Sequence, residues 1–384
     1  MATAQEIRAL LAANSMQKYY IRFNDRNFAN HIAHCIVAVS ALGANKQRLD
    51  RAVEIEAKIQ RPASYGARDN PQRLENSGEL TTTCYYDFLE FYNKKLNIIH
   101  SNNLSSLLNA EFPKLVRSLH ADTFHGLIQM GYGLAAGSDQ TVVEGLAWMH
   151  YGGNPNIELT REELAVPIGQ GSLAPLAVLE VLRCDPKIIS LGIRGRSAFG
   201  RFINATTEGE RCRELQWYAN QMNFAVGKAD DVKALASELV ALAIAVYAMA
   251  ETRNDFFLLH GVTAAWSLKQ IVSQLKDRKD QLAALQTMAI FALAVYIAQG
   301  TPVVAPNTAE MERASKETWE SIVAKALKYD YETHVFKLVQ VCKDIAAEMP
   351  HHDVLCKAAA LCSLENDLVN FGAAIQKMHE LQAV

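Results

Sequence analysis

The segment from Phe28 to Leu42 reads Phe-Ala-Asn-His-Ile-Ala-His-Cys-Ile-Val-Ala-Val-Ser-Ala-Leu. Drawn as a helix, it carries apolar side chains on nearly all sides, which is typical of a helix buried in a protein core. Gly43 follows directly, and glycine favours the end of a helix. The segment also contains His31 and His34, which are three residues apart and therefore share one helix face. We predict a helical core that contains imidazoles.

Helical patterns of this kind recur along the whole chain of 384 residues, whereas alternating strand patterns are nearly absent. The stretches from Ala165 to Pro175 and from Leu191 to Gly200 are irregular. We predict an all-α fold with a buried metal or substrate pocket, and a single large helical domain over residues 1–384. The further predicted helices span 85–99, 104–119, 123–136, 141–151, 173–183, 208–226, 230–251, 255–275, 280–299, 315–328, 331–348 and 352–380.

The composition excludes several classes of protein. Hydrophobic residues make up 50% of the chain, charged residues make up 21%, and the net charge is −3 without a Lys/Arg block, so nucleic acid is not an expected partner. The cysteines are seven in number and form no Cys-x-x-Cys pair, which favours reduced thiols in a cytoplasmic protein. Met1 to Ala13 lacks the pattern of a signal peptide. Leu282 to Ala298 contains Gln286 and is interpreted as a core helix, so no membrane is expected.

Four apolar segments, well separated along the chain, each carry a histidine. A buried imidazole needs a partner for both ring nitrogens, and leaving one unpaired costs free energy. One such histidine is common in cores, but several on separate helices suggest a shared partner, for which a transition metal is suited. We therefore predict one metal centre for the residues His31, His125, His260 and His334.

Each of these histidines also has a simpler interpretation as an ordinary core residue. His31 and His34 can satisfy each other on one helix face, with Asn30 orienting either ring. His120 and His125 are five residues apart, which is about 140° around a helix, so only one can face a common centre. His125 is preferred because its neighbours are more apolar, and His120 is expected at a helix start.

Lys337 lies one helical turn after His334, within an apolar stretch. Its charge must reach water or a partner such as Glu332 or Asp330. Alternatively, burial and a nearby cation lower its pKa, and the neutral amine reacts with carbon dioxide to form a carbamate. A carbamate would give the histidine set an anionic oxygen ligand.

Other catalytic motifs are missing from the sequence. Gly169-Gln170-Gly171 lacks the third glycine and the strand–helix setting of a dinucleotide-binding motif. Walker A, Gly-x-Ser-x-Gly and His-Glu-x-x-His sequences do not occur, and neither do the Glu-x-x-His pairs of helical di-iron proteins.

The four histidine segments, in this order, resemble the questin oxidase-like family. The matching stretches are Asn30-His31, Phe124-His125-Gly126-Leu127-Ile128, Leu259-His260-Gly261-Val262-Thr263 and His334-Val335-Phe336-Lys337-Leu338. The resemblance implies an all-α fold and a non-haem iron held by His31, His125, His260, His334 and a carboxylated Lys337. It leaves Asn30, His34, His120 and Tyr132 as candidates beside the ligands.

The family includes fungal enzymes that oxidatively open anthraquinone-type rings. The expected function is therefore an Fe(II)-dependent oxygenase that uses O2 on an aromatic or quinone-like small molecule. Four imidazoles and one oxygen donor leave one octahedral position open, which favours iron over zinc. Aromatic side chains that either line a substrate pocket or simply pack the core are Phe124, Trp148, Phe256, Phe257 and Trp266.

Two alternatives remain open at this point. One is a nicotinamide-dependent, Baeyer–Villiger-like monooxygenase that takes its electrons from NADPH. The other is a non-catalytic helical protein that binds a metal or a small molecule. The sequence does not indicate the oligomeric state.

Overall fold

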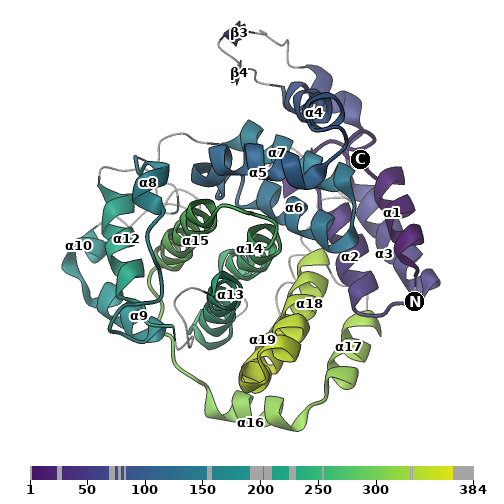
Figure 1. The fold of residues 1–384 in the computed structure, drawn as a ribbon. Coiled ribbons are helices and arrows are strands. Elements are labelled where there is room, and N and C mark those ends of the chain that lie inside the picture. Colours follow the sequence, from purple (N-terminus) through teal and green to yellow (C-terminus); the bar gives the residue numbers. More distant parts are fainter. Residues whose placement is uncertain are drawn as a thin grey trace. The chain divides into compact units, whose positions relative to one another are not determined.

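The computed structural model describes residues 2–23, 28–68, 74–76, 79–81, 84–153, 158–190, 202, 210–224, 231–252, 255–328, 330 and 332–365 (Figure 1). Within these residues helices dominate, and the named strands form only two small antiparallel sheets of two strands each. The predicted all-α class is confirmed. The chain divides into two compact units, and the prediction of one domain over residues 1–384 stays a prediction.

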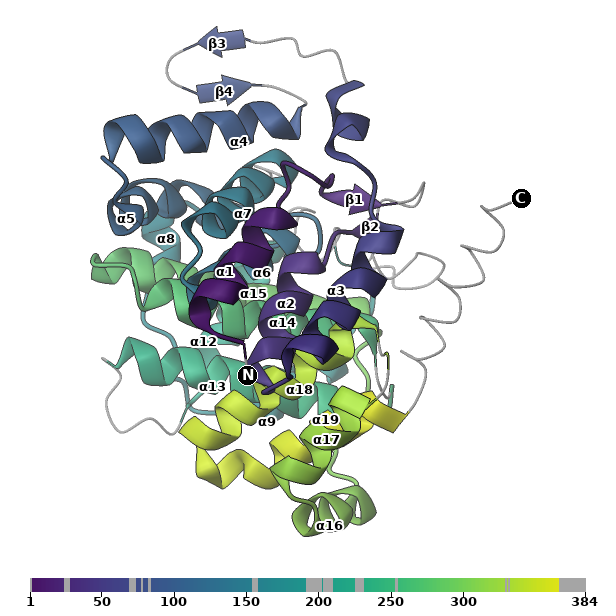
Figure 2. The same ribbon diagram turned by 90° about the vertical axis from the view of Figure 1, so that its right-hand side faces the viewer.

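The first unit comprises the described residues of Met1–Gly153 and Val323–Gln340. In this unit α2 packs against α3 and α6, and α6 packs along α7 (Figure 2). In the first sheet, Arg22 pairs with Ala29 and Phe23 pairs with Phe28. Its elements are α1 (Ala4–Ala13), β1 (Arg22–Phe23), β2 (Phe28–Ala29), α2 (Ile32–Ala41), α3 (Lys46–Ile59), η1 (Ala63–Arg68), β3 (Leu74–Asn76), β4 (Glu79–Thr81), α4 (Tyr85–Lys94), η2 (Lys95–Ile99), α5 (Leu104–Leu115), η3 (Val116–Ser118), α6 (His125–Ala136), α7 (Asp139–Gly152), and parts of α17 (Trp319–Lys328) and α18 (Thr333–Glu348).

The second unit comprises the described residues of Asn154–Ile322 and Val341–Asn366. Here α13 packs against α14, α15 and α19. Asp231, Asp255 and Asp277 each cap one of these long helices by accepting hydrogen bonds from first-turn N–H groups. The elements are α8 (Arg161–Leu164), α9 (Pro175–Cys184), α10 (Pro186–Ser190), α12 (Arg211–Gln221), α13 (Val232–Met249), α14 (Phe256–Val272), α15 (Arg278–Ala298), α16 (Thr308–Lys316), the remaining parts of α17 and α18, η4 (Pro350–His352) and α19 (Asp353–Glu365).

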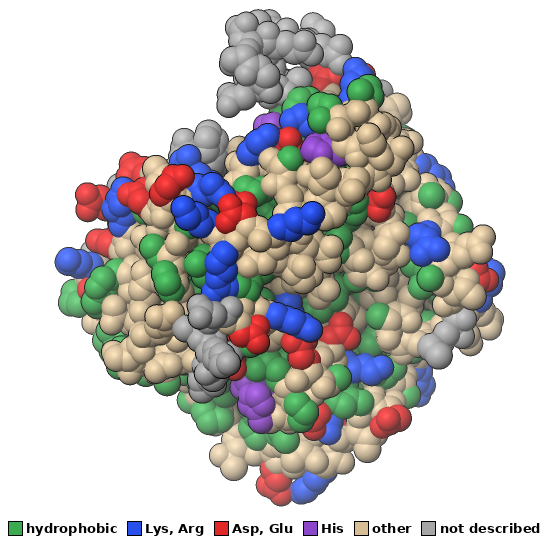
Figure 3. All heavy atoms as spheres, in the orientation of Figure 1, with side chains coloured by type: hydrophobic (Ala, Val, Ile, Leu, Met, Phe, Trp, Pro, Cys, Tyr) green, Lys and Arg blue, Asp and Glu red, His purple; other side chains and the backbone are tan. Residues whose placement is uncertain are grey.

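Two helices, α13 and α15, are long and apolar enough to cross a membrane by length and composition. Their most apolar windows are 72% and 89% buried inside the structure, and core helices of soluble proteins pass the same test. The surface drawn in Figure 3 intermixes acidic and basic side chains, in keeping with the small net charge.

Several predicted helix boundaries are wrong. Residues 28 and 29 form strand β2, so the first predicted helix begins only at Ile32. The helix predicted from residue 123 begins at His125, because the three preceding residues have positive φ angles. The helices α1, α3 and α16 were not predicted. The predicted irregular stretch 191–200 and residues 366–380 of the last predicted helix lie outside the described residues.

Glycines bring the backbones of α6 and α7 into direct contact. A Cβ atom on Gly126 would lie 2.5 Å from the backbone nitrogen of Met149, and one on Gly145 would lie 2.6 Å from the backbone nitrogen of Met130. Real Cβ atoms are essentially never that close to other heavy atoms. Since Gly126 directly follows His125, this contact fixes the start of α6, where a candidate site residue lies.

We expect Gly145→Ala to lower the free energy of unfolding by about 1–3 kcal/mol, the usual cost of overpacking a core. Urea denaturation measures the change. Gly152→Ala is the matched control on the same helix, because its Cβ would meet no atom closer than 3.5 Å. Equal stability of Gly145→Ala and the wild type would contradict the close contact between α6 and α7.

Candidate metal centre

Two of the predicted histidines meet at the starts of two helices in the first unit. His31 directly precedes the first residue of α2, and His125 is the first residue of α6. Both side chains are buried, and their Nε2 atoms lie 3.0 Å apart. Two ring nitrogens at this distance either share a proton or face a common cation. The spacing is a normal hydrogen-bond length, and it also fits a shared cation, since two nitrogens at right angles around a metal, each about 2.1 Å from it, are about 3.0 Å apart.

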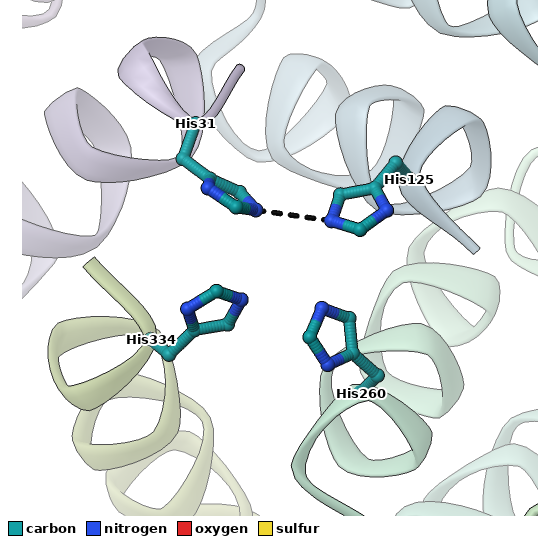
Figure 4. A group of neighbouring side chains, drawn as sticks. All are labelled: His31, His125, His260 and His334. Atoms are coloured by element: carbon teal, nitrogen blue, oxygen red, sulfur yellow. Dashed lines mark hydrogen bonds between the residues drawn. The ribbon is translucent and has the colours of Figure 1, made fainter. Parts of the chain in front are cut away.

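His334, near the start of α18, belongs to the same group. The centre of its ring lies 4.5 Å from that of His31, and its side chain is 1% exposed. One ring nitrogen each from His31, His125 and His334 lies within 4.8 Å of the others. Figure 4 shows the imidazoles of His31, His125 and His334 turned toward one another.

The tautomers of three of these histidines follow from their hydrogen bonds. Nδ1 of His125 lies 2.5 Å from the Asp122 carbonyl oxygen, and Nδ1 of His260 lies 2.7 Å from that of Phe256. Nδ1 of His334 lies 2.6 Å from the Glu332 carboxylate. Because each acceptor is an oxygen, Nδ1 carries the proton and Nε2 keeps its lone pair. Such orientation of an imidazole by an oxygen acceptor is characteristic of metal-binding histidines.

The backbone before His125 is strained. Asp122, Thr123 and Phe124 have φ angles of 49°, 56° and 68°. This left-handed conformation costs roughly 1–2 kcal/mol per residue that is not glycine. The Asp122 carboxylate is held by Trp148 Nε1 at 2.9 Å and by Arg22 Nε at 3.1 Å. These bonds support the turn that points the Asp122 carbonyl oxygen at His125, as strained backbone at functional sites often does.

Lys337 is fully buried, and its Nζ atom has no hydrogen-bond partner among the described residues. Burial lowers the pKa of Lys337 to about 8, although the nearby Glu332 and Glu56 raise it in part. Snorkelling to water is therefore wrong for this lysine. Asp330, proposed as a partner, instead forms ion pairs with Arg48 and Arg51. The structure holds a buried amine that lacks a hydrogen bond and loses its proton more readily than an exposed lysine does.

Two carboxyl groups accompany this amine, and sequence reasoning missed the role of both. Burial raises the pKa of Glu332 and that of Glu56 to about 7. Glu332 accepts the hydrogen bond from His334, and Glu56 accepts one from the Thr333 hydroxyl. The spacing of Glu332, two residues before His334, was the available signal, but it does not distinguish a hydrogen-bond partner from a surface charge.

The other polar residues predicted beside the ligands are all buried. His34 stacks on Tyr132 with ring centres 5.3 Å apart, and Tyr132 donates a hydrogen bond to Gln340. The Asn30 side chain accepts from the Ile32 N–H and donates to the Tyr20 carbonyl, so it holds the backbone on both sides of His31. His120 lies in the turn before His125 and not at a helix start.

The predicted aromatic residues differ in their positions. Trp148 stacks on His125 with ring centres 5.7 Å apart, and the ring of Phe256 lies 4.4 Å from that of His260. Phe124 is buried directly before His125. The Phe257 ring lies against Phe256, and Trp266 donates a hydrogen bond to Asp344. A substrate pocket lined by these side chains stays a prediction.

Comparison with known proteins adds a second line of evidence. A model of the questin oxidase-like family matches residues 28–342, a range that contains all five predicted ligand positions. A Baeyer–Villiger oxidase of Paecilomyces divaricatus is 24% identical over 340 residues, which cover 82% of this chain and 73% of that protein. A questin oxidase of Aspergillus fumigatus is 23% identical, and the aligned residues cover 82% of this chain and 75% of that protein. An oxidoreductase of Aspergillus parasiticus is 23% identical, and the aligned residues cover 86% of this chain and 70% of that protein. These findings confirm the family resemblance and identify the chain as an oxidoreductase.

We expect the metal-free protein to lose stability as the pH falls from about 6.5 to 5. Burial lowers the pKa of His31, His34, His120, His125, His150, His334 and His352. Each takes up its proton mainly on unfolding, which lowers the stability by up to about 1.4 kcal/mol per pH unit.

Three buried carboxyls act in the opposite direction. The pKa values of Glu56, Glu144 and Glu332 are raised to about 7. Between pH 7 and about pH 4.5 these carboxyls therefore bind protons preferentially in the folded state, which stabilises it as the pH falls. The histidines outnumber these carboxyls, so we expect the free energy of unfolding to fall as the pH falls. Urea denaturation at several pH values measures it, with the surface variant His100→Gln as control. Constant or rising stability on acidification would contradict burial of the neutral histidines.

Proposed function

The chain belongs to the questin oxidase-like family, and we propose that it is a non-haem, Fe(II)-dependent oxygenase. Its substrates would be O2 and an aromatic or quinone-like small molecule. The observation that carries the proposal is the group of buried imidazoles whose lone-pair nitrogens face one another beside the unpaired amine of Lys337.

Five residues of this chain would hold the iron. His31, His125 and His334 lie together in the first unit, and we propose His260 on α14 as the fourth imidazole. A carboxylated Lys337 would supply the anionic oxygen. Neutral imidazoles leave the charge of a divalent cation uncompensated, so an oxygen anion among the ligands balances part of it.

The carbamate forms without a further reactant besides carbon dioxide. The neutral amine of Lys337 attacks the carbon atom, an N–C bond forms as one carbon–oxygen π bond breaks, and the amine nitrogen loses a proton. The lowered pKa of Lys337 favours the neutral amine that this step requires. Glu332 and Glu56 both have a pKa of about 7, so a carboxylate near the amine can take up the proton that the amine releases.

The protein would contribute orientation and exclusion of water. When bound, ferrous iron supplies the redox chemistry that allows O2 to react with an organic substrate. Glu332 and the Asp122 carbonyl fix the rings of His334 and His125, so the ligands need little reorganisation. Burial of all the candidate ligands keeps bulk water from the centre.

Baeyer–Villiger-like monooxygenation with NADPH is the second candidate. It is favoured by a relative named as a Baeyer–Villiger oxidase that matches 82% of this chain. Uptake of O2 by iron-loaded protein and substrate, with and without NADPH, distinguishes the two reactions. A non-catalytic metal-binding protein would consume no O2 in either case.

We expect iron-reconstituted wild type to bind about one iron per chain, and His125→Ala to lose most of it, since three or more ligands are needed for a stable site. His120→Ala is the matched control, because His120 is also buried and lies in the turn before α6. Metal analysis after gel filtration gives the iron content, and circular dichroism shows whether each variant folds. Equal iron content of the two variants would refute the assignment of His125.

We expect Lys337→Arg to lose both iron and activity, because a guanidinium stays charged and cannot be carboxylated. Lys343→Arg on the same helix is the matched control. Reconstitution of wild type with iron should also improve when bicarbonate is added and worsen when carbon dioxide is removed. Full iron content in Lys337→Arg would show that Lys337 is not a ligand.

A further inference from the structure

A second group of metal-ligating side chains lies in the second unit, outside the centre described above. Glu238 projects from α13, and His351 and His352 form the end of η4. One ligand atom from each of the three lies within 4.8 Å of the others. The two imidazole rings have their centres 4.2 Å apart. These are the donor types and the spacing that a divalent transition metal uses.

The helices that present these side chains are fixed by their immediate neighbours. Ser237, next to Glu238, donates a hydrogen bond to the Glu348 carboxylate at 2.6 Å. Glu348 is the last residue of α18 and also pairs with Lys269 on α14. Pro350 then begins η4, and the His352 N–H donates to the Met349 carbonyl at 2.9 Å. These bonds are made by neighbouring side chains and by the backbone, so the side chains of the three ligating residues take no part in them.

No described residue satisfies these groups. The Glu238 carboxylate and the ring nitrogens of His351 and His352 have no hydrogen bond or ion pair with other described residues. Glu238 is half-buried. His351 is exposed, which leaves the group accessible from solvent. A cation bound here would balance the carboxylate and use both imidazoles.

We propose that Glu238, His351 and His352 form a second metal site that binds Zn²⁺. Two imidazoles and one carboxylate are the protein ligands of many open zinc sites, in which water completes the shell. Bound zinc would join α13 to η4 and so stabilise the corner between α18 and α19. The proposal does not depend on the buried histidine centre or on the oxygenase activity.

The test titrates ZnCl2 into tag-free, full-length protein and measures the number of ions bound by calorimetry and metal analysis. The variants are Glu238→Gln and the double variant His351→Ala/His352→Ala. His100→Ala is the matched control, because His100 is a surface histidine of the first unit that is bonded to Ser106. The buried histidine centre can also take up zinc. The test therefore compares the number of zinc ions bound per chain, which should be one higher in the wild type than in the double variant.

We expect the wild type and His100→Ala to bind one zinc ion more than the double variant, and their thermal midpoints to rise with zinc by more than that of the double variant. Glu238→Gln should weaken this site on the order of tenfold or more, since even the outer partners of metal sites contribute that much. Unchanged zinc stoichiometry and affinity in both site variants would overturn the proposal. A crystal soaked in ZnCl2 that lacks anomalous density at Glu238 would also overturn it.

Discussion

The hydrogen bonds to Nδ1 of the buried histidines determine what the site can do. An imidazole that donates from Nδ1 to a fixed oxygen presents an unprotonated Nε2 on its opposite side. The Asp122 carbonyl, the Phe256 carbonyl and the Glu332 carboxylate each impose this tautomer on one histidine. The acceptors come from a strained turn, a helix carbonyl and the residues before α18. The local folds of three separate segments therefore determine the same property, the tautomer of a histidine.

Strain and close packing around His125 follow from the same requirement. The left-handed turn at residues 122–124 ends where α6 begins, and Gly126 allows the first turn of α6 to approach the backbone of α7. Trp148 on α7 both holds the Asp122 carboxylate and stacks on the His125 ring. The unfavourable backbone conformation is therefore offset by contacts of the helix against which α6 packs.

The sequence was sufficient for the helical class and for the positions where His31, His125 and His334 lie, because apolar periodicity reports burial directly. It was not sufficient for local backbone geometry. Strand β2 occupies only two residues, too few for an alternating pattern, and positive φ angles at Asp122, Thr123 and Phe124 contradict their intrinsic preferences. Tertiary contacts of Arg22 and Trp148 impose that turn. The role of Glu332 also depends on burial, which single-residue spacing does not reveal.

Charge balance gives a physical reason for a lysine at position 337. In the metal-free protein, a protonated Lys337 is countered by the nearby buried carboxylates, and Glu332 contributes the largest favourable interaction. An aspartate or glutamate in its place would add a like charge to Glu332 and Glu56 and would be costly to bury. In the proposed iron-loaded site, the carbamate charge and the Glu332 charge together offset a divalent cation. A lysine that becomes an anion only on reaction with carbon dioxide would therefore counter the buried carboxylates without the metal and help to offset the charge of the cation with it.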